Sequence, residues 1–231
     1  MPPDVITSAQ TKVVAALLRD VGRMPFHPSI DGRLLDGPPA SAFAAGVGAG
    51  IPLLAGTTSE EMRLYVDAQA EPPARGRLVK RVSRYLGADE ASAGTIIDRY
   101  ARALDTDDLG EVWVTLFSDA EMQVPLQRAL DAHAEIAPTF TYLFSWRAPD
   151  VGAFHAVDLP FTFGTFDADG WGAFVGVDDD ARALSRALRD AWAAFARDGA
   201  PPWPARPSTM VFDRASRVVD DPLGPRLSAL S

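Results

Sequence analysis

The chain has 231 residues, of which 47% are hydrophobic, so it can bury a sizeable core as one domain or two small ones. Its formal net charge of −9 argues against a nucleic-acid partner, because phosphates are bound by clustered Lys and Arg. The absence of cysteine excludes disulfides, thiolate metal sites and a cysteine nucleophile, and no apolar run reaches the roughly 18 residues of a membrane span.

The amino-terminal quarter predicts two helices and one buried strand. Residues 1–4 lack the basic and apolar regions of a signal peptide, so we expect a cytoplasmic chain. Apolar residues at helical spacing predict an amphipathic helix over 8–21, and a loop-rich stretch over 22–50 contains a short alanine-rich helix. The apolar run 51–55 lies between two glycines and fits a strand buried on both faces, as in a parallel sheet.

The middle of the chain predicts a group of helices followed by a second strand. The pattern from about 75 to 136 is helical, and Pro125 should kink or break its last stretch. Residues 139–146 are rich in aromatic and β-branched side chains, which is typical of a strand.

The carboxyl-terminal part predicts a long helix and a small hairpin. Asp178–Asp180 favour a helix start electrostatically, and Gly199 with Pro201 should end that helix. Residues 209–213 and 217–220 read as a hairpin. The order strand, helices, strand, helix indicates an α/β arrangement.

Two carboxylates and a histidine follow the two predicted strands. Glu60 and Glu61 come shortly after the strand 51–55, and His155 lies in a turn of small residues after the strand 139–146. An acid after one strand and a histidine after a later one is the order in which α/β-hydrolases present the last two members of their catalytic triad. The spacing favours Glu61 over Glu60 as the acid, although both are candidates.

The nucleophile of such a triad is missing from the sequence. No serine lies in a Gly-x-Ser-x-Gly turn, the strained elbow that exposes the nucleophile in this fold. The nearest imitation, residues 90–94, has Glu in place of the first glycine and lies in a helical run. Ser59 and Ser92 are therefore the first serines to test if the chain proves active by itself.

Several segments resemble, in sequence and in order, motifs of the type-B carboxylesterases, the group of the para-nitrobenzyl esterases and cholinesterases. The likeness runs from about residue 24 to 222 and is strongest at 25–65 and 138–222. Its motifs are Pro28–Leu35, Ile51–Tyr65, Ser118–Asp119 with Pro125, Gly152–Gly164, Trp192–Pro201 and Thr209–Asp213.

The resemblance implies roles for two residues. Glu61 matches the family's triad acid and His155 its catalytic base, whereas Met62 and Ala156 replace glycines of the motifs and Glu60 stands where Asp is usual. The part of the family's sequence with the elbow serine and the oxyanion glycines has no counterpart here.

The resemblance also implies the architecture. Residues 1–231 form a single partial α/β-hydrolase domain, with two parallel strands, several helices, a C-terminal antiparallel hairpin and the N-terminal half of the sheet missing. Residues 66–137 are then a helical insertion between the acid-bearing and the His-bearing segments.

Two functions follow as hypotheses. In the first, the chain is the C-terminal portion of a carboxylic-ester hydrolase that needs no cofactor or metal. It would act on a small-molecule ester once an N-terminal esterase fragment complements it, and would otherwise self-associate. In the second, it is a catalytically inactive, esterase-like remnant or a protein-binding module.

The remaining polar residues carry structural expectations. His27, in a loop, and His133, on a polar helix face, are expected to be surface or packing residues. Asp158 is expected to support the site or a turn without belonging to the triad. The acidic run 178–180 is expected to start a helix, with no role as a metal site.

Overall fold

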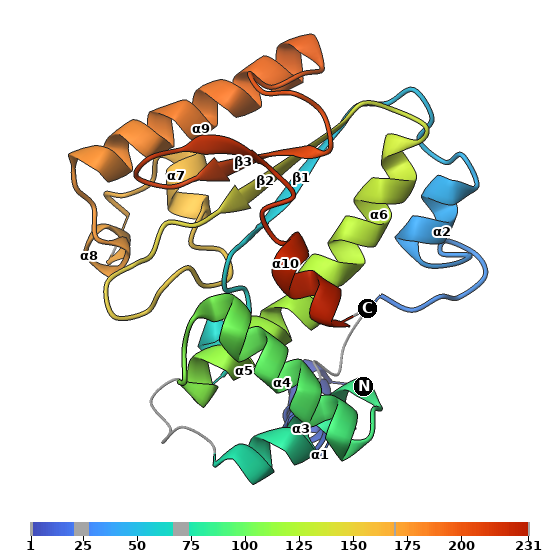
Figure 1. Cartoon of the computed structure of the whole chain (residues 1–231). Helices are drawn as coiled ribbons and strands as arrows, with labels where there is room; N and C mark the ends of the chain where they lie inside the picture. The colour runs from blue at the N-terminus through green and yellow to red at the C-terminus, as the bar shows by residue number, and fades with distance from the viewer. Residues whose placement is uncertain (1, 21–27, 67–73, 169, 231) are drawn as a thin grey trace.

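The fold is built on a four-stranded sheet, seen in a computed structural model that describes residues 2–20, 28–66, 74–168 and 170–230. Its strands are β1 (Leu53–Thr58), β2 (Thr139–Phe144), β3 (Ser208–Phe212) and β4 (Arg217–Asp220), in that spatial order (Figure 1). The first three run parallel, and β4 returns antiparallel to β3. The predicted parallel neighbours and the predicted C-terminal hairpin are thus both present.

The strand bounds differ from those that the sequence predicts. β1 begins two residues later than expected, directly after Pro52, which has no N–H to donate. It continues through Gly56–Thr58, which pair with Tyr142–Phe144 of β2. β2 ends at Phe144, two residues earlier than expected.

Alternating side chains of β2 serve two different cores, as the period of a strand requires. Tyr142 and Phe144 face a large cluster that includes α7 (Leu159–Phe163) and α9 (Asp179–Asp198). Leu143 packs with Val211 and Leu223 on the opposite face, where α6 (Val124–Ala134) and α10 (Gly224–Leu227) lie (Figure 1). The sheet is therefore covered by helices on both faces, and the short α8 (Trp171–Val175) adjoins α7 and α9.

A group of helices with its own core lies beyond the carboxyl end of β1 (Figure 1). It consists of α3 (Arg75–Leu86), α4 (Glu90–Leu104) and α5 (Leu109–Ser118). Asp89 and Asp108 cap α4 and α5 by accepting from backbone N–H groups of their first turns. The 3₁₀ turns Arg63–Tyr65 and Ser228–Leu230 adjoin this group.

Pro125 does not break the helical run around it. A π-helical segment, Asp119–Gln123, joins α5 to α6, and Pro125 lies in the first turn of α6. Because a π turn shifts the pattern of backbone hydrogen bonds, the ring of a proline can follow it without ending the helix.

The termini of α9 agree with the prediction from sequence. The Asp178 side chain accepts from the Ala181 N–H, and Gly199 adopts the left-handed conformation at the other end.

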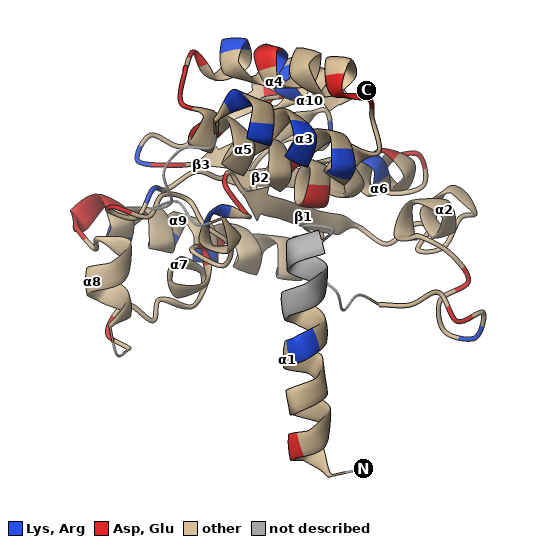
Figure 2. Ribbon diagram, turned by 90° about the horizontal axis from the view of Figure 1, so that it is seen from below, with Lys and Arg blue, Asp and Glu red and all other residues tan. Residues whose placement is uncertain are grey.

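The amino-terminal helix stands apart from the sheet. α1 (Pro3–Asp20) projects away from the body of the molecule, whereas α2 (Pro39–Ala44) packs near α6 (Figure 2). Within the part of the chain that the structure describes, no helix combines the length and the apolar character needed to cross a membrane.

Candidate active site

Glu61 lies at the carboxyl end of β1, where the strand pairing ends. The Ser59 N–H still donates to the carbonyl of Phe144 at 2.9 Å, which extends the β1–β2 pairing by one residue. The Glu61 side chain then folds back, and its Oε1 accepts from the Thr58 N–H at 2.7 Å. Only 6% of Glu61 is exposed, so this carboxylate is held in one position by buried surroundings.

His155 reaches the same point from the end of β2. The chain closes a small loop in which Ala148 and Gly152 exchange backbone hydrogen bonds of 3.0 and 2.9 Å. Phe154 and Val157 on either side of the histidine are buried in the core of the sheet. These anchors leave the His155 side chain 48% exposed, with its ring directed to Glu61.

The two side chains form a close pair. His155 Nδ1 lies 2.6 Å from Glu61 Oε2, although 94 positions separate the residues in sequence. With Nδ1 bonded to the carboxylate, Nε2 is the ring atom left to exchange a proton with a reactant, and no described residue bonds to it. An imidazole held in this way can act as a general base, with its tautomer fixed by the carboxylate.

Glu60 faces a different set of partners. Its Oε2 accepts from Arg63 Nε at 2.5 Å and from the Ala153 N–H at 2.9 Å, and its Oε1 pairs with Arg147. These contacts leave Glu60 away from the imidazole, so the structure separates the two carboxylates that the sequence left as alternatives.

Ser118, on α5, holds the backbone next to Glu61. Its Oγ accepts from the backbone N–H of Met62 at 3.0 Å, next to Glu61, and donates to the Val114 carbonyl. The neighbouring Asp119 is fully buried and accepts two hydrogen bonds from Arg226. The sequence motif includes Ser118–Asp119, but its spacing does not predict these distant partners.

Asp158 adjoins the pair without bonding to the histidine. Its Oδ2 lies 3.5 Å from the hydroxyl of Tyr142. Burial raises the pKa of the Asp158 carboxyl above its usual value, and the negative charge of Glu61 raises it further.

The other histidines and serines lie elsewhere. His133 is buried, with Nδ1 2.7 Å from Thr139 Oγ1, so the prediction of a polar helix face is wrong although a packing role is right. His27 falls outside the described residues. Ser92 Oγ donates to Asp89 at the start of α4, and neither Ser92 nor Ser59 forms a hydrogen bond with His155. Among the described residues, no cluster of His, Asp or Glu could hold a metal ion.

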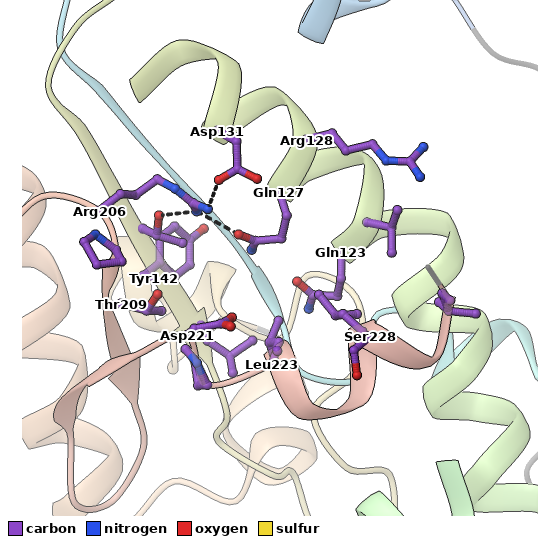
Figure 3. Close-up of a pocket in the computed structure, with 18 residues that line it drawn as sticks. Gln123, Gln127, Arg128, Asp131, Tyr142, Arg206, Thr209, Asp221, Leu223 and Ser228 are labelled. Atoms are coloured by element: carbon purple, nitrogen blue, oxygen red, sulfur yellow. Dashed lines mark hydrogen bonds and ion pairs between the residues drawn. The ribbon is translucent and has the colours of Figure 1, made fainter. Parts of the chain in front are cut away.

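A pocket of about 500 Å³ lies between α6, the sheet and the C-terminal segment (Figure 3). Arg206 crosses it, donating to Gln127 Oε1 at 2.7 Å and to Thr141 Oγ1 at 3.2 Å and pairing with Asp131. Gln123 also lines it, and the buried Oε1 of this side chain has no hydrogen-bond partner among the described residues. This pocket does not include the Glu61–His155 pair, and nothing in the sequence patterns predicted it.

Comparison with known proteins agrees with this geometry. The sequence model described as "Carboxylesterase family" matches residues 1–215. This chain belongs to the carboxylesterase family. It is 30% identical over 209 residues to the para-nitrobenzyl esterase of Bacillus subtilis, covering 85% of this chain and 41% of that protein.

Solved structures give the same result. A thermophilic para-nitrobenzyl esterase superposes on this chain with a TM-score of 0.80 at 26% identity. The match covers 100% of this chain and 49% of the esterase. The carboxylesterase of Geobacillus stearothermophilus matches 94% of this chain and 48% of its own, with a TM-score of 0.78 and 31% identity. The present chain thus spans less than half the length of these esterases, and the predicted α/β-hydrolase fold and family are confirmed.

Proposed function

We propose that this chain supplies the acid and the base of a serine carboxylic-ester hydrolase. Glu61 would be the acid and His155 the base. The serine and the oxyanion donors would come from a segment outside these 231 residues. The observation that carries this proposal is the 2.6 Å contact between His155 Nδ1 and the buried Glu61 carboxylate, with the ring half exposed.

The chemistry would follow from this geometry. His155 Nε2 takes the proton of the serine hydroxyl while its oxygen attacks the ester carbonyl, and then returns that proton to the leaving alcohol. A water molecule repeats the sequence to release the acid and restore the serine. Glu61 holds the Nδ1–H and stabilises the imidazolium that forms in each step, and the Thr58 N–H keeps its carboxylate in place.

The open edge of β1 is the place at which the missing segment would join. β1 is the outermost strand of the described sheet on that side, and it carries no Lys, Pro or bulge to protect its unpaired groups. Native proteins usually protect an exposed strand edge, for example by covering it with another segment. A strand that pairs with β1 and ends in a serine-bearing turn would bring its nucleophile to the same edge of the sheet as Glu61 and His155.

Exposed apolar side chains beside the pair support an occupant of this kind. Tyr65 is 49% exposed and its ring lies 6.3 Å from that of His155. Leu159, whose N–H donates to the carbonyl of Ala156 next to His155, is 46% exposed. A small ester or a covering segment would bury these surfaces.

The second candidate function is that of an inactive protein-binding module. The observation in its favour is the exposure of large apolar residues away from the pair, such as Leu34 at 90% and Ile51 at 65%. This function needs no serine and predicts association without turnover.

Ester hydrolysis separates the two functions. The chain alone should hydrolyse p-nitrophenyl acetate no faster than free histidine does, because it offers no activated nucleophile. A polypeptide encoded directly upstream that ends in Gly-x-Ser-x-Gly should restore turnover, which His155→Ala lowers about 10³-fold or more. Glu90→Gln, on the exposed start of α4, is the matched control and should leave that turnover unchanged.

Two other results would speak against the proposal. Turnover by the chain alone that depends on His155 would place the nucleophile within these residues. Binding of the upstream polypeptide without any turnover would favour the binding module.

A further inference from the structure

Glu60 binds both backbone groups of one residue in the histidine loop. The Glu60 N–H donates to the carbonyl of Ala153 at 3.0 Å, and Glu60 Oε2 accepts from the Ala153 N–H at 2.9 Å. His155 follows Ala153 by only two residues. A residue held at both its N–H and its C=O has little freedom to shift, so this double contact fixes the approach of the loop to β1.

Gly152 makes this contact possible. It has a φ of +90°, in the left-handed region that favours glycine. A Cβ at this position would lie 2.3 Å from Glu60 Oε2 and 2.8 Å from Arg63 Cδ and Nε. The first glycine of the histidine motif is therefore required both by its conformation and by the closeness of the Glu60 carboxylate.

Two arginines balance the charge of Glu60. Arg63, only 7% exposed, donates from Nε to Glu60 at 2.5 Å and from Nη1 and Nη2 to Glu111 on α5 at 2.9 and 2.5 Å. Arg147, which follows β2, pairs with the other Glu60 oxygen. A buried carboxylate with these partners is held rigidly, whereas an unpaired one would be costly.

The histidine depends on this loop because its ring has few other supports. The side chain is 48% exposed, and Glu61 is its hydrogen-bond partner among the described residues. A displacement of the backbone by about 1 Å would break a hydrogen bond of this length.

We infer that Glu60 is a positioning residue, whose two contacts with Ala153 hold the loop so that His155 meets Glu61. This inference rests on the proposed function for its catalytic meaning, but the contacts themselves can be tested without turnover. Glu60 itself does not touch the imidazole in the structure; it acts through Ala153.

The first test is hydrogen exchange of the Ala153 amide in the whole chain, measured relative to the amide of Leu143 in β2. In the wild type this amide should be protected. Glu60→Ala should speed its exchange about fivefold or more, because the loss of one hydrogen bond changes the opening equilibrium by about this factor. Glu60→Gln keeps an acceptor of the same size and should retain most of the protection.

Glu111→Gln is the matched control. It removes a carboxylate from the other side of Arg63 but leaves the contacts between Glu60 and Ala153 intact, so the Ala153 amide should stay protected.

The second test is the tautomer of His155, read from the ¹⁵N shifts of its ring at a pH at which free imidazole is uncharged. The contact with Glu61 favours the Nδ1–H form. Glu60→Ala should lower the ratio of Nδ1–H to Nε2–H about fivefold, and Glu60→Gln and Glu111→Gln should leave it close to the wild-type ratio.

The inference fails if Glu60→Ala leaves both the Ala153 exchange and the ring tautomer unchanged, or if the wild-type Ala153 amide exchanges like an exposed one. Should Glu60→Ala not fold, Gly152→Ala decides, since its methyl group blocks the same contact. Glu61→Ala separates the two proposals. An unchanged His155 tautomer in this variant would contradict the Glu61–His155 pair and the proposed function. The exchange of the Ala153 amide would still test the role of Glu60.

Discussion

At the scale of single residues, Ala156, the residue after His155, has a strained backbone conformation. The resemblance predicts glycine where this chain has Ala156, and Ala156 has a φ of +70°. A residue with a Cβ is strained by roughly 1–2 kcal/mol in this left-handed region. The backbone conformation therefore explains why the family motif has glycine here. The sequence alone shows only that this chain departs from the motif.

Ala156→Gly should stabilise the protein. The relief of strain exceeds the extra conformational entropy that glycine loses on folding, and we expect a gain of about 0.5–1 kcal/mol, or a few degrees in Tm. Thermal unfolding measures it. Ala187→Gly, at an exposed site within α9, is the control and should cost about 1 kcal/mol instead. A loss of stability in Ala156→Gly would contradict the assignment of strain.

The site residues were predictable to different degrees. Glu61 and His155 could be chosen because each follows a predicted strand within a motif, and their predicted contact is present. The partners of Glu60 could not, because local spacing does not say which way a carboxylate turns or that Ala153 comes to meet it. The polar helix face that the sequence predicts for His133 is wrong, because its hydrogen-bond partner, Thr139, belongs to the next strand.

At the scale of elements, caps were easier to predict than bounds. The acidic run at the start of α9 and the glycine after it predict both ends of that helix. The π-helical segment before Pro125 could not be predicted, because the spacing of apolar residues does not mark a single wider turn within a helical run.

The cap of α9 makes stability depend on pH. The hydrogen bond from the Ala181 N–H, and then Arg214, hold the pKa of Asp178 below its usual value of 3.8. Because the folded-state pKa is depressed, this contribution is present above the unfolded value and is lost as the pH falls through the folded value.

Asp178→Ala should therefore lower the urea midpoint at about pH 7, and the difference from wild type should shrink toward zero at about pH 2. Asp190→Ala, within the exposed face of the same helix, should have little effect at either pH. A difference that persists unchanged in acid would show that the charged cap is not its source.

At the scale of the whole molecule, the sheet has two different edges. β4 is short and carries Arg217 and Asp220, whereas the other edge, β1, has no charged residue between Leu53 and Thr58. Residues near it are exposed and apolar, among them Ile51. We therefore expect the chain to self-associate by itself or to bind a complementary esterase segment.

Sedimentation velocity at micromolar concentration measures this association. Ile51→Lys should weaken it, because a charge beside β1 disfavours strand pairing and burial. Val218→Lys, on the β4 edge, is the matched control and should not weaken it. A wild-type chain that sediments as a monomer and melts cooperatively would contradict the open-edge account.

The central claim, that Glu61 and His155 activate a serine from outside these residues, is tested most directly by labelling with a fluorophosphonate, which reacts with activated serines. We expect no label on this chain alone. Mixed with the upstream Gly-x-Ser-x-Gly polypeptide, the label should appear on the serine of that polypeptide, and His155→Ala should abolish it. Label on this chain by itself, at Ser59, Ser92 or another serine, or labelling of the partner that ignores His155→Ala, would contradict the account.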